Sequence, residues 1–141
     1  LPGALLLPGG RLPLHIFEPR YLAMTLDSLA QGRMFGMVQP DPALPRIGAD
    51  SQVYRVGCLG RISSFAEADA DTANGRLLIT LTGLIRFRIV EEIAPRRGYR
   101  RVRADYEPYR ADLLDEGPEP VVDRDALLAA LRPYFRSRGL E

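Results

Sequence analysis

Apolar side chains alternate with polar ones in short runs through most of the first 107 residues. The clearest run spans residues 76–90 and is interrupted once, by Gly83; its alternate apolar residues are Leu77, Ile79, Leu81, Ile85, Phe87 and Ile89. A period of two is that of a β-strand with one buried face. We therefore predict strands over 76–82 and 84–90, with a bend at the glycine between them.

Further strands are predicted at 11–17, 34–39, 53–65 and 99–107, and Tyr54, Val56, Cys58 and Ile62 are expected to share one face of the third. The apolar run Leu5–Leu7 is expected to pair with strand 11–17 after the turn at Pro8-Gly9-Gly10. Gly57 and Gly60 indicate a bulge or bend, and Asn74-Gly75 indicates a hairpin turn. Three prolines between 40 and 45 predict an exposed loop over 40–51.

Helical periodicity occurs twice. Residues 18–31 are predicted to form a helix, because Pro19 suits the first helical position and Gly32 suits a C′ cap. Its apolar face holds Leu22, Leu26 and Leu29. A second helix is predicted over 122–132, capped by Asp123 and kinked or ended by Pro133.

The predicted fold is therefore mainly β, of the α+β class, with short strands closing or nearly closing a small barrel against one early helix. The barrel is expected to occupy 1–107, an acidic, proline-rich linker 108–120, and the start of a C-terminal helical region 121–141. No apolar run approaches membrane-spanning length, and a cytoplasmic protein is expected.

The residues available for chemistry are few. All 19 basic residues are arginine, so the lysine of a P-loop or of a Ser-Lys peptidase is missing from this chain. The chain has one histidine, His15, and one cysteine, Cys58, which are too few for a typical zinc site and leave only one possible Cys-His pair. Cys58 falls on the same alternate positions as apolar residues of a predicted strand, so it is expected to be a small core residue. We predict no catalytic residue, no metal site and no cofactor.

Short motifs follow one another in a specific order: Leu1-Pro2-Gly3, Pro8-Gly9, LPLHIFEPRY at 12–21, Phe35-Gly36, Val56-Gly57-Cys58-Leu59, Gly75-Arg76 and LTGLIRF at 81–87. In this order the chain closely resembles the amino-terminal, substrate-binding domain of Lon proteases, over roughly residues 1–107. The resemblance implies a pseudo-β-barrel similar to the PUA fold, with helix 18–31 packed on it. It also implies a helical region after the barrel, of which the end at Glu141 leaves only the first element.

The resemblance predicts a non-catalytic binding module, a stand-alone bacterial relative that captures unfolded or flexible polypeptide segments. A protease or an ATPase is a further candidate partner. Exposed apolar side chains near flexible loops would make the contacts. The candidate contact residues are Met34, Phe35, Met37 and Leu44, together with Arg20 beside the strand–helix corner. An extended substrate is also a candidate to pair with a sheet edge beside Pro13.

RNA binding is the alternative, because PUA-like folds include RNA binders and Arg96–Arg103 is a basic cluster. Its candidate contacts are Arg97, Tyr99, Arg101 and Arg103. Residues 1–103 hold 14 arginines against 9 acids, and residues 104–141 hold 5 against 9. The net charge of the chain is only +1, which weighs against a strongly electrostatic nucleic-acid binder.

Overall fold

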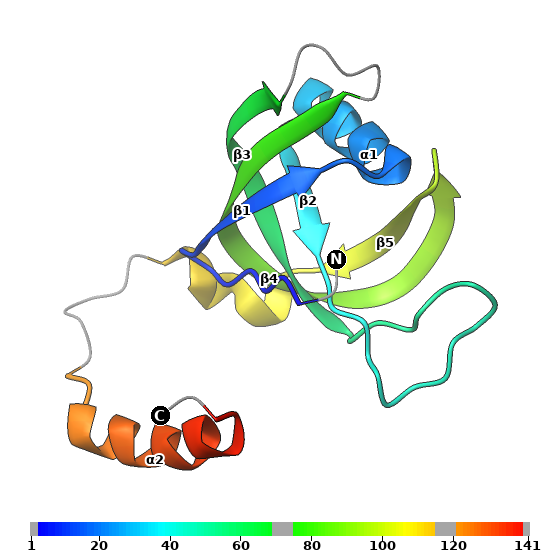
Figure 1. Cartoon of the computed structure of the whole chain (residues 1–141). Helices are drawn as coiled ribbons and strands as arrows, with labels where there is room; N and C mark the ends of the chain where they lie inside the picture. The colour runs from blue at the N-terminus through cyan, green and yellow to red at the C-terminus, as the bar shows by residue number, and fades with distance from the viewer. Residues whose placement is uncertain (1–2, 69–74, 115–120, 140–141) are drawn as a thin grey trace.

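The structure, a computed structural model, describes residues 3–68, 75–114 and 121–139. Five strands, two α-helices and one 3-10 helix follow one another along these residues (Figure 1). In chain order they are β1 (Arg11–Ile16), α1 (Pro19–Ala30), β2 (Met34–Met37), β3 (Val56–Ala68), β4 (Arg76–Arg96), β5 (Tyr99–Asp105), η1 (Glu107–Leu113) and α2 (Arg124–Ser137).

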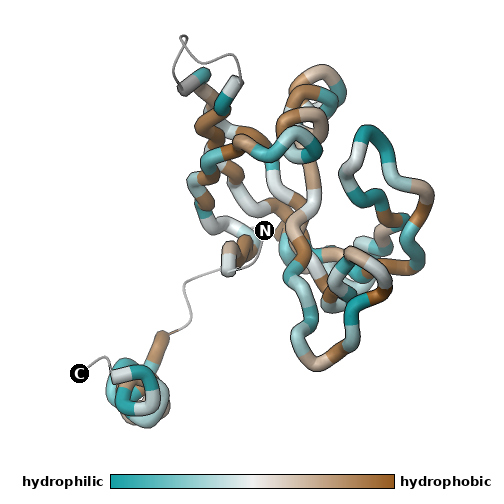
Figure 2. The backbone as a smooth tube through the Cα atoms, turned by 45° about the vertical axis from the view of Figure 1, so that its right-hand side comes forward, coloured by the Kyte–Doolittle hydropathy of each residue, from teal (hydrophilic) through white to brown (hydrophobic). Residues whose placement is uncertain are grey.

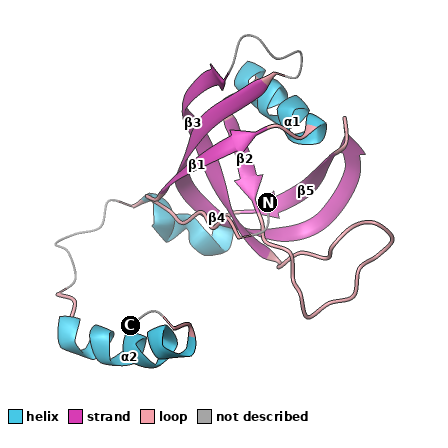
Figure 3. Cartoon of the chain, in the orientation of Figure 1, coloured by secondary structure: helices cyan, strands magenta, loops and turns pink. Residues whose placement is uncertain are grey.

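The strands form one antiparallel sheet in the order β1-β4-β3-β2, and β5 pairs with the second half of β4 (Figure 3). The mainly β class predicted from the alternation is thus confirmed, as is the edge position of β1, the strand that contains Pro13. The sheet is open, however. Within the described residues β2 pairs only with β3 and β5 only with β4, so the barrel is not closed between β2 and β5.

The sequence predicted two strands divided at Gly83, and this was wrong. β4 is a single strand of 21 residues that includes Gly83. The N-terminal segment crosses β4 at this glycine: Gly9 N–H donates to Gly83 O, and Gly83 N–H donates to Gly10 O, both at 2.9 Å. A Cβ on Gly83 would overlap the carbonyl oxygen of Leu7. The glycine is therefore needed for close approach of two backbones. Leu5–Leu7 lies across β4 and forms no strand with 11–17, so that predicted pairing was wrong.

The core follows the predicted alternation of β4, whose six alternate apolar residues are all buried together with Ile16 and Ile62. In the tube of Figure 2, brown hydrophobic residues alternate with paler and teal residues along parts of the chain. Of the four residues predicted to share one face of the third strand, Cys58 and Ile62 are buried, whereas Tyr54 and Val56 are exposed. Tyr54 lies outside the strand, and the register shifts between Leu59 and Gly60. Burial keeps one parity across that shift, at Cys58, Gly60 and Ile62, and Val56 is exposed at the first residue of the strand.

Both predicted helices are present. α1 begins at Pro19, and Gly32 adopts the left-handed conformation expected at C′, with φ of +79°. Asp123 caps α2 by accepting hydrogen bonds from the N–H groups of Asp125 and Ala126. α2 continues through Pro133 to Ser137, beyond its predicted end. None of the described helices has the length and apolar character needed to cross a membrane. Asn74, of the predicted hairpin turn, lies outside the described residues.

The first part of the segment expected to be a linker forms η1, which docks on β4. The Arg86 side chain donates to both carboxylate oxygens of Asp112, at 2.9 and 2.8 Å, and the Arg86 backbone N–H donates to the same carboxylate at 3.0 Å. The guanidinium also lies 4.8 Å from the centre of the Tyr109 ring. These contacts attach residues 107–113 to the sheet. The domain boundaries themselves stay a prediction.

Acid should weaken the hydrogen bonds between Arg86 and Asp112 that attach η1 to β4. The Arg86 hydrogen bonds lower the pKa of Asp112 from 3.8 to about 2. A carboxylate whose pKa is lowered by folding stabilises the fold fully above about pH 4, and that contribution is lost as the pH falls towards 2. We expect Asp112→Asn to lower the urea midpoint at pH 7, and the difference from wild type to disappear near pH 2. A difference that stays constant across this range would contradict the assignment.

Candidate functional site

A cleft of about 500 Å³ lies where the sheet fails to close, between β2 and β5. α1 borders it on one side, and the loop over residues 40–53, which follows β2, borders it on another. This loop is exposed, as predicted, and two isolated bridges, Pro40–Val53 and Ile47–Asp50, hold its arms together. The cleft is therefore a consequence of the open sheet.

The lining of the cleft is mostly apolar and rich in sulfur and aromatic rings. All three methionines of the chain contribute to it, although they come from two different elements: Met24, Met34 and Met37. The aromatic residues are Tyr21, Phe35, Phe87, Tyr99 and Tyr106. Met34 is 42% exposed, whereas Phe35 and Met37 are buried in the floor. Methionine side chains adapt to differently shaped apolar partners.

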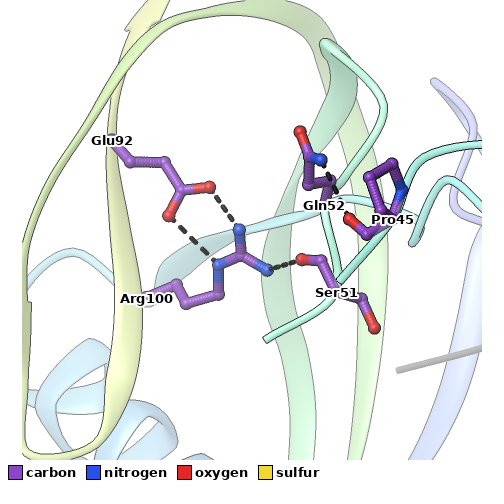
Figure 4. Close-up of polar contacts among 5 residues, drawn as sticks. All are labelled: Pro45, Ser51, Gln52, Glu92 and Arg100. Atoms are coloured by element: carbon purple, nitrogen blue, oxygen red, sulfur yellow. Dashed lines mark hydrogen bonds and ion pairs between the residues drawn. The ribbon is translucent and has the colours of Figure 1, made fainter. Parts of the chain in front are cut away.

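Arg100 of β5 joins the hairpin to the 40–53 loop at the mouth of the cleft (Figure 4). Its guanidinium donates to both carboxylate oxygens of Glu92 and, through a third N–H, to the carbonyl oxygen of Ser51 at 2.7 Å. Gln52 then donates to the carbonyl oxygen of Pro45 at 2.9 Å, which braces the loop internally. The mouth of the cleft is thus held by polar contacts between segments about 50 residues apart.

Asp27 of α1 holds the turn of the β4–β5 hairpin. The Tyr99 hydroxyl donates to one carboxylate oxygen at 2.8 Å, and the Arg97 guanidinium donates to the other at 2.5 Å. The Tyr99 hydrogen bond and the neighbouring Arg97 lower the pKa of Asp27, while burial and the Asp27 carboxylate raise the pKa of Tyr99. Tyr99 and Arg97 therefore have structural partners in α1.

The charged groups that line the cleft have a positive excess. Four arginines, Arg20, Arg46, Arg100 and Arg101, stand against two acids, Asp50 and Glu92. Arg20 pairs with Glu18 at 3.2 Å, outside the lining, and lies over the Tyr21 ring. No described residue forms a hydrogen bond or an ion pair with the guanidinium of Arg101.

Four of the five residues predicted for polypeptide binding line this one cleft: Arg20, Met34, Phe35 and Met37. The fifth, Leu44, is exposed in the 40–53 loop and is not part of the lining. Sequence reasoning did not assign Met24 or Tyr106 to a site, and it placed Phe87 only in the core. For Met24, the signal in the sequence was that all three methionines of the chain lie within one short stretch.

Of the residues predicted for RNA binding, Tyr99 and Arg101 line the cleft. Arg97 pairs with Asp27, and Arg103 pairs with Glu91 at 2.8 Å. Asp27 of α1 and Glu91 of the neighbouring strand β4 therefore neutralise part of the basic cluster. Its role in RNA binding stays a prediction.

Among the described residues no group of three His, Cys, Asp or Glu side chains is arranged to hold a metal ion. Cys58 is buried, and burial raises the pKa of its thiol, which disfavours the reactive thiolate. The geometry of the cleft instead suits the binding of apolar groups beside positive charge.

One family model matches most of this chain. The family model described as the ATP-dependent protease La (LON) substrate-binding domain matches residues 1–138. Among solved structures, the crystal structure of a Lon N-terminal domain protein from Xanthomonas campestris superposes with a TM-score of 0.55 at 23% identity. That match covers 93% of this chain and 67% of that one, and it supports the fold. The comparison with curated proteins finds no match.

Proposed function

The chain belongs to the LON substrate-binding domain family, and from this premise we propose that it is a non-catalytic module that binds polypeptide segments in the cleft between β2 and β5. One observation carries the assignment to this cleft. Its lining gathers every methionine of the chain with five aromatic side chains beside an opening in the sheet. A protease or ATPase partner and a cytoplasmic location belong to the same proposal.

A folded protein buries most of its large apolar side chains. Unfolded segments display large apolar side chains, and burying one of them releases about 1.5–3 kcal/mol. Sites that accept such side chains are concave and mostly apolar, with a few polar groups that orient the ligand. Methionine side chains allow the same floor to accept valine, leucine or phenylalanine without a fixed fit.

Fluorescence anisotropy with two labelled probes tests this function. One probe is an unfolded, apolar-rich polypeptide and the other a single-stranded RNA, each titrated at low and high salt. We expect the polypeptide to bind with little change on adding salt. RNA binding through several phosphates would fall steeply with salt. Salt-sensitive RNA binding that is lost in the Arg101→Ala/Arg103→Ala variant, without polypeptide binding, would replace the proposal by the RNA alternative.

Met34→Asp should weaken polypeptide binding at least about tenfold, because it places a carboxylate where the ligand brings apolar groups. The side chain is 42% exposed, so the unfolding midpoint should change little. Val90→Asp is the matched control, since Val90 is 50% exposed in a strand but does not line the cleft. Equal losses in both variants would indicate that the cleft is not the binding site.

A further inference from the structure

We propose that the bound polypeptide lies in the cleft as an extended strand, adds to the free edge of β2, and carries a carboxylate. This inference rests on the proposed function and names its substrate class: extended, apolar segments with an acidic group, recognised mainly through their backbone. Main-chain recognition of this kind gives affinity with little dependence on sequence.

The register of β2 shows which backbone groups are free. Ile62 N–H donates to Arg33 O before the strand, and Tyr54 N–H donates to Gln39 O after it. Antiparallel pairs alternate between hydrogen-bonded and non-hydrogen-bonded positions. The odd-numbered residues of β2 therefore bond to β3, whereas the N–H and C=O groups of Met34 and Gly36 point to the opposite edge.

This edge is open and lies in the cleft. Met34 and Gly36 are exposed and line the cleft, and no described strand pairs with β2 on that side. Gly36 has a further role, since a Cβ there would come within 2.8 Å of the Phe87 ring. The ring thus packs against bare backbone and forms part of the floor beside the edge. An added strand would satisfy the backbone groups that now face solvent.

The excess of positive charge in the cleft favours a ligand that carries a negatively charged group. Its lining carries four arginines against two acids, and the acid Glu92 already pairs with Arg100. Arg101 has no hydrogen-bonding or ion-pair partner among the described residues. A carboxylate on the bound segment complements this excess, whereas an added cation is repelled.

Backbone recognition is tested with an acetylated and amidated peptide of serine, valine and leucine with one central glutamate. Two versions of identical composition carry N-methyl groups on alternate residues, one on the odd and one on the even positions. A single edge pairs with only one set of N–H groups. We expect one version to bind at least about tenfold more weakly than the unmodified peptide and the other within about twofold.

Hydrogen exchange gives an independent readout from the protein side. We expect the unmodified peptide to slow amide exchange at Met34 and Gly36 and to leave that of Phe35, already bonded to β3, unchanged. Equal affinity of the unmodified peptide and of both N-methylated versions, with no added protection at Gly36, would overturn strand addition and leave the proposed function standing. Absence of any binding by the unmodified peptide would overturn both.

The carboxylate is tested by exchanging the glutamate for glutamine or lysine. We expect affinity to fall in the order glutamate, glutamine, lysine, with about tenfold between the first and the last. Arg101→Gln should reduce this discrimination. Arg103→Gln, on the same strand but paired with Glu91 and outside the lining, should not. Equal affinity for the three peptides, or equal effects of the two variants, would overturn the acidic preference.

Discussion

Gly83→Ala is expected to lower the free energy of unfolding by about 3 kcal/mol, although it adds a single methyl group. The new Cβ would overlap the carbonyl oxygen of Leu7 and lie 2.7 Å from its carbonyl carbon. Both are backbone atoms and have no rotamer by which to move aside. The crossing segment is also bound to Gly83 through Gly9 and Gly10. The whole N-terminal segment must therefore shift, and it must give up these hydrogen bonds.

Gly75→Ala is the control for the same change of residue. Gly75 lies just before β4, and a Cβ there would meet no atom within 4 Å. Urea unfolding followed by circular dichroism should show a variant within about 0.5 kcal/mol of wild type. If the two glycine variants proved equally stable, the crossing of the N-terminal segment over β4 would be wrong.

Phe87→Ala should cost about 3–5 kcal/mol of stability and should also open the floor of the cleft. Its ring is 2% exposed, contacts the Tyr106 ring edge-to-face at 6.0 Å, and fills the space left by two glycines, Gly36 and Gly57. Because glycine has no side chain, neither position can fill the volume that the ring leaves. We therefore expect a cavity, with weaker polypeptide binding in the fraction that stays folded.

Phe17→Ala supplies the comparison, because Phe17 is 60% exposed and lies outside the cleft lining. Its removal should change the unfolding free energy by less than about 1 kcal/mol. Thermal unfolding of the two variants, with peptide anisotropy at a temperature where both are folded, separates stability from binding. A Phe87→Ala protein as stable as Phe17→Ala, with unchanged peptide affinity, would contradict this account of the floor.

The stretch LTGLIRF, which contributed to the family resemblance, has distinct structural tasks along one strand. Gly83 admits the N-terminal segment, Arg86 attaches η1 through Asp112, and Phe87 forms part of the cleft floor. The sequence predicted only an alternation with a glycine in it. It did not show that the three residues connect the sheet to three different neighbours, since these neighbours lie far away in the chain.

The strands, both helix starts and the buried face of β4 were predictable from the sequence, because each depends on a local period or a local cap. Local signals were insufficient at Gly83 and around Tyr54. A glycine within an alternating run is compatible with a bend or with a close backbone approach, and only the crossing segment distinguishes them. Around Tyr54 the apolar alternation of the sequence begins before the strand does, and the start of β3 at Val56 depends on its pairing with β4.

The candidate site shows the same division. The sequence by itself determined which side chains are apolar, which are basic, and which alternate, and so it proposed Met34 and Arg20 as contacts. Only the tertiary structure decided that β2 and β5 do not pair with each other within the described residues, that Arg97 and Arg103 meet carboxylates, and that Met24, Phe87 and Tyr106 share a cleft with Met34. The physical reason is distance along the chain: strand closure and ion pairing depend on long-range geometry, which no local period encodes.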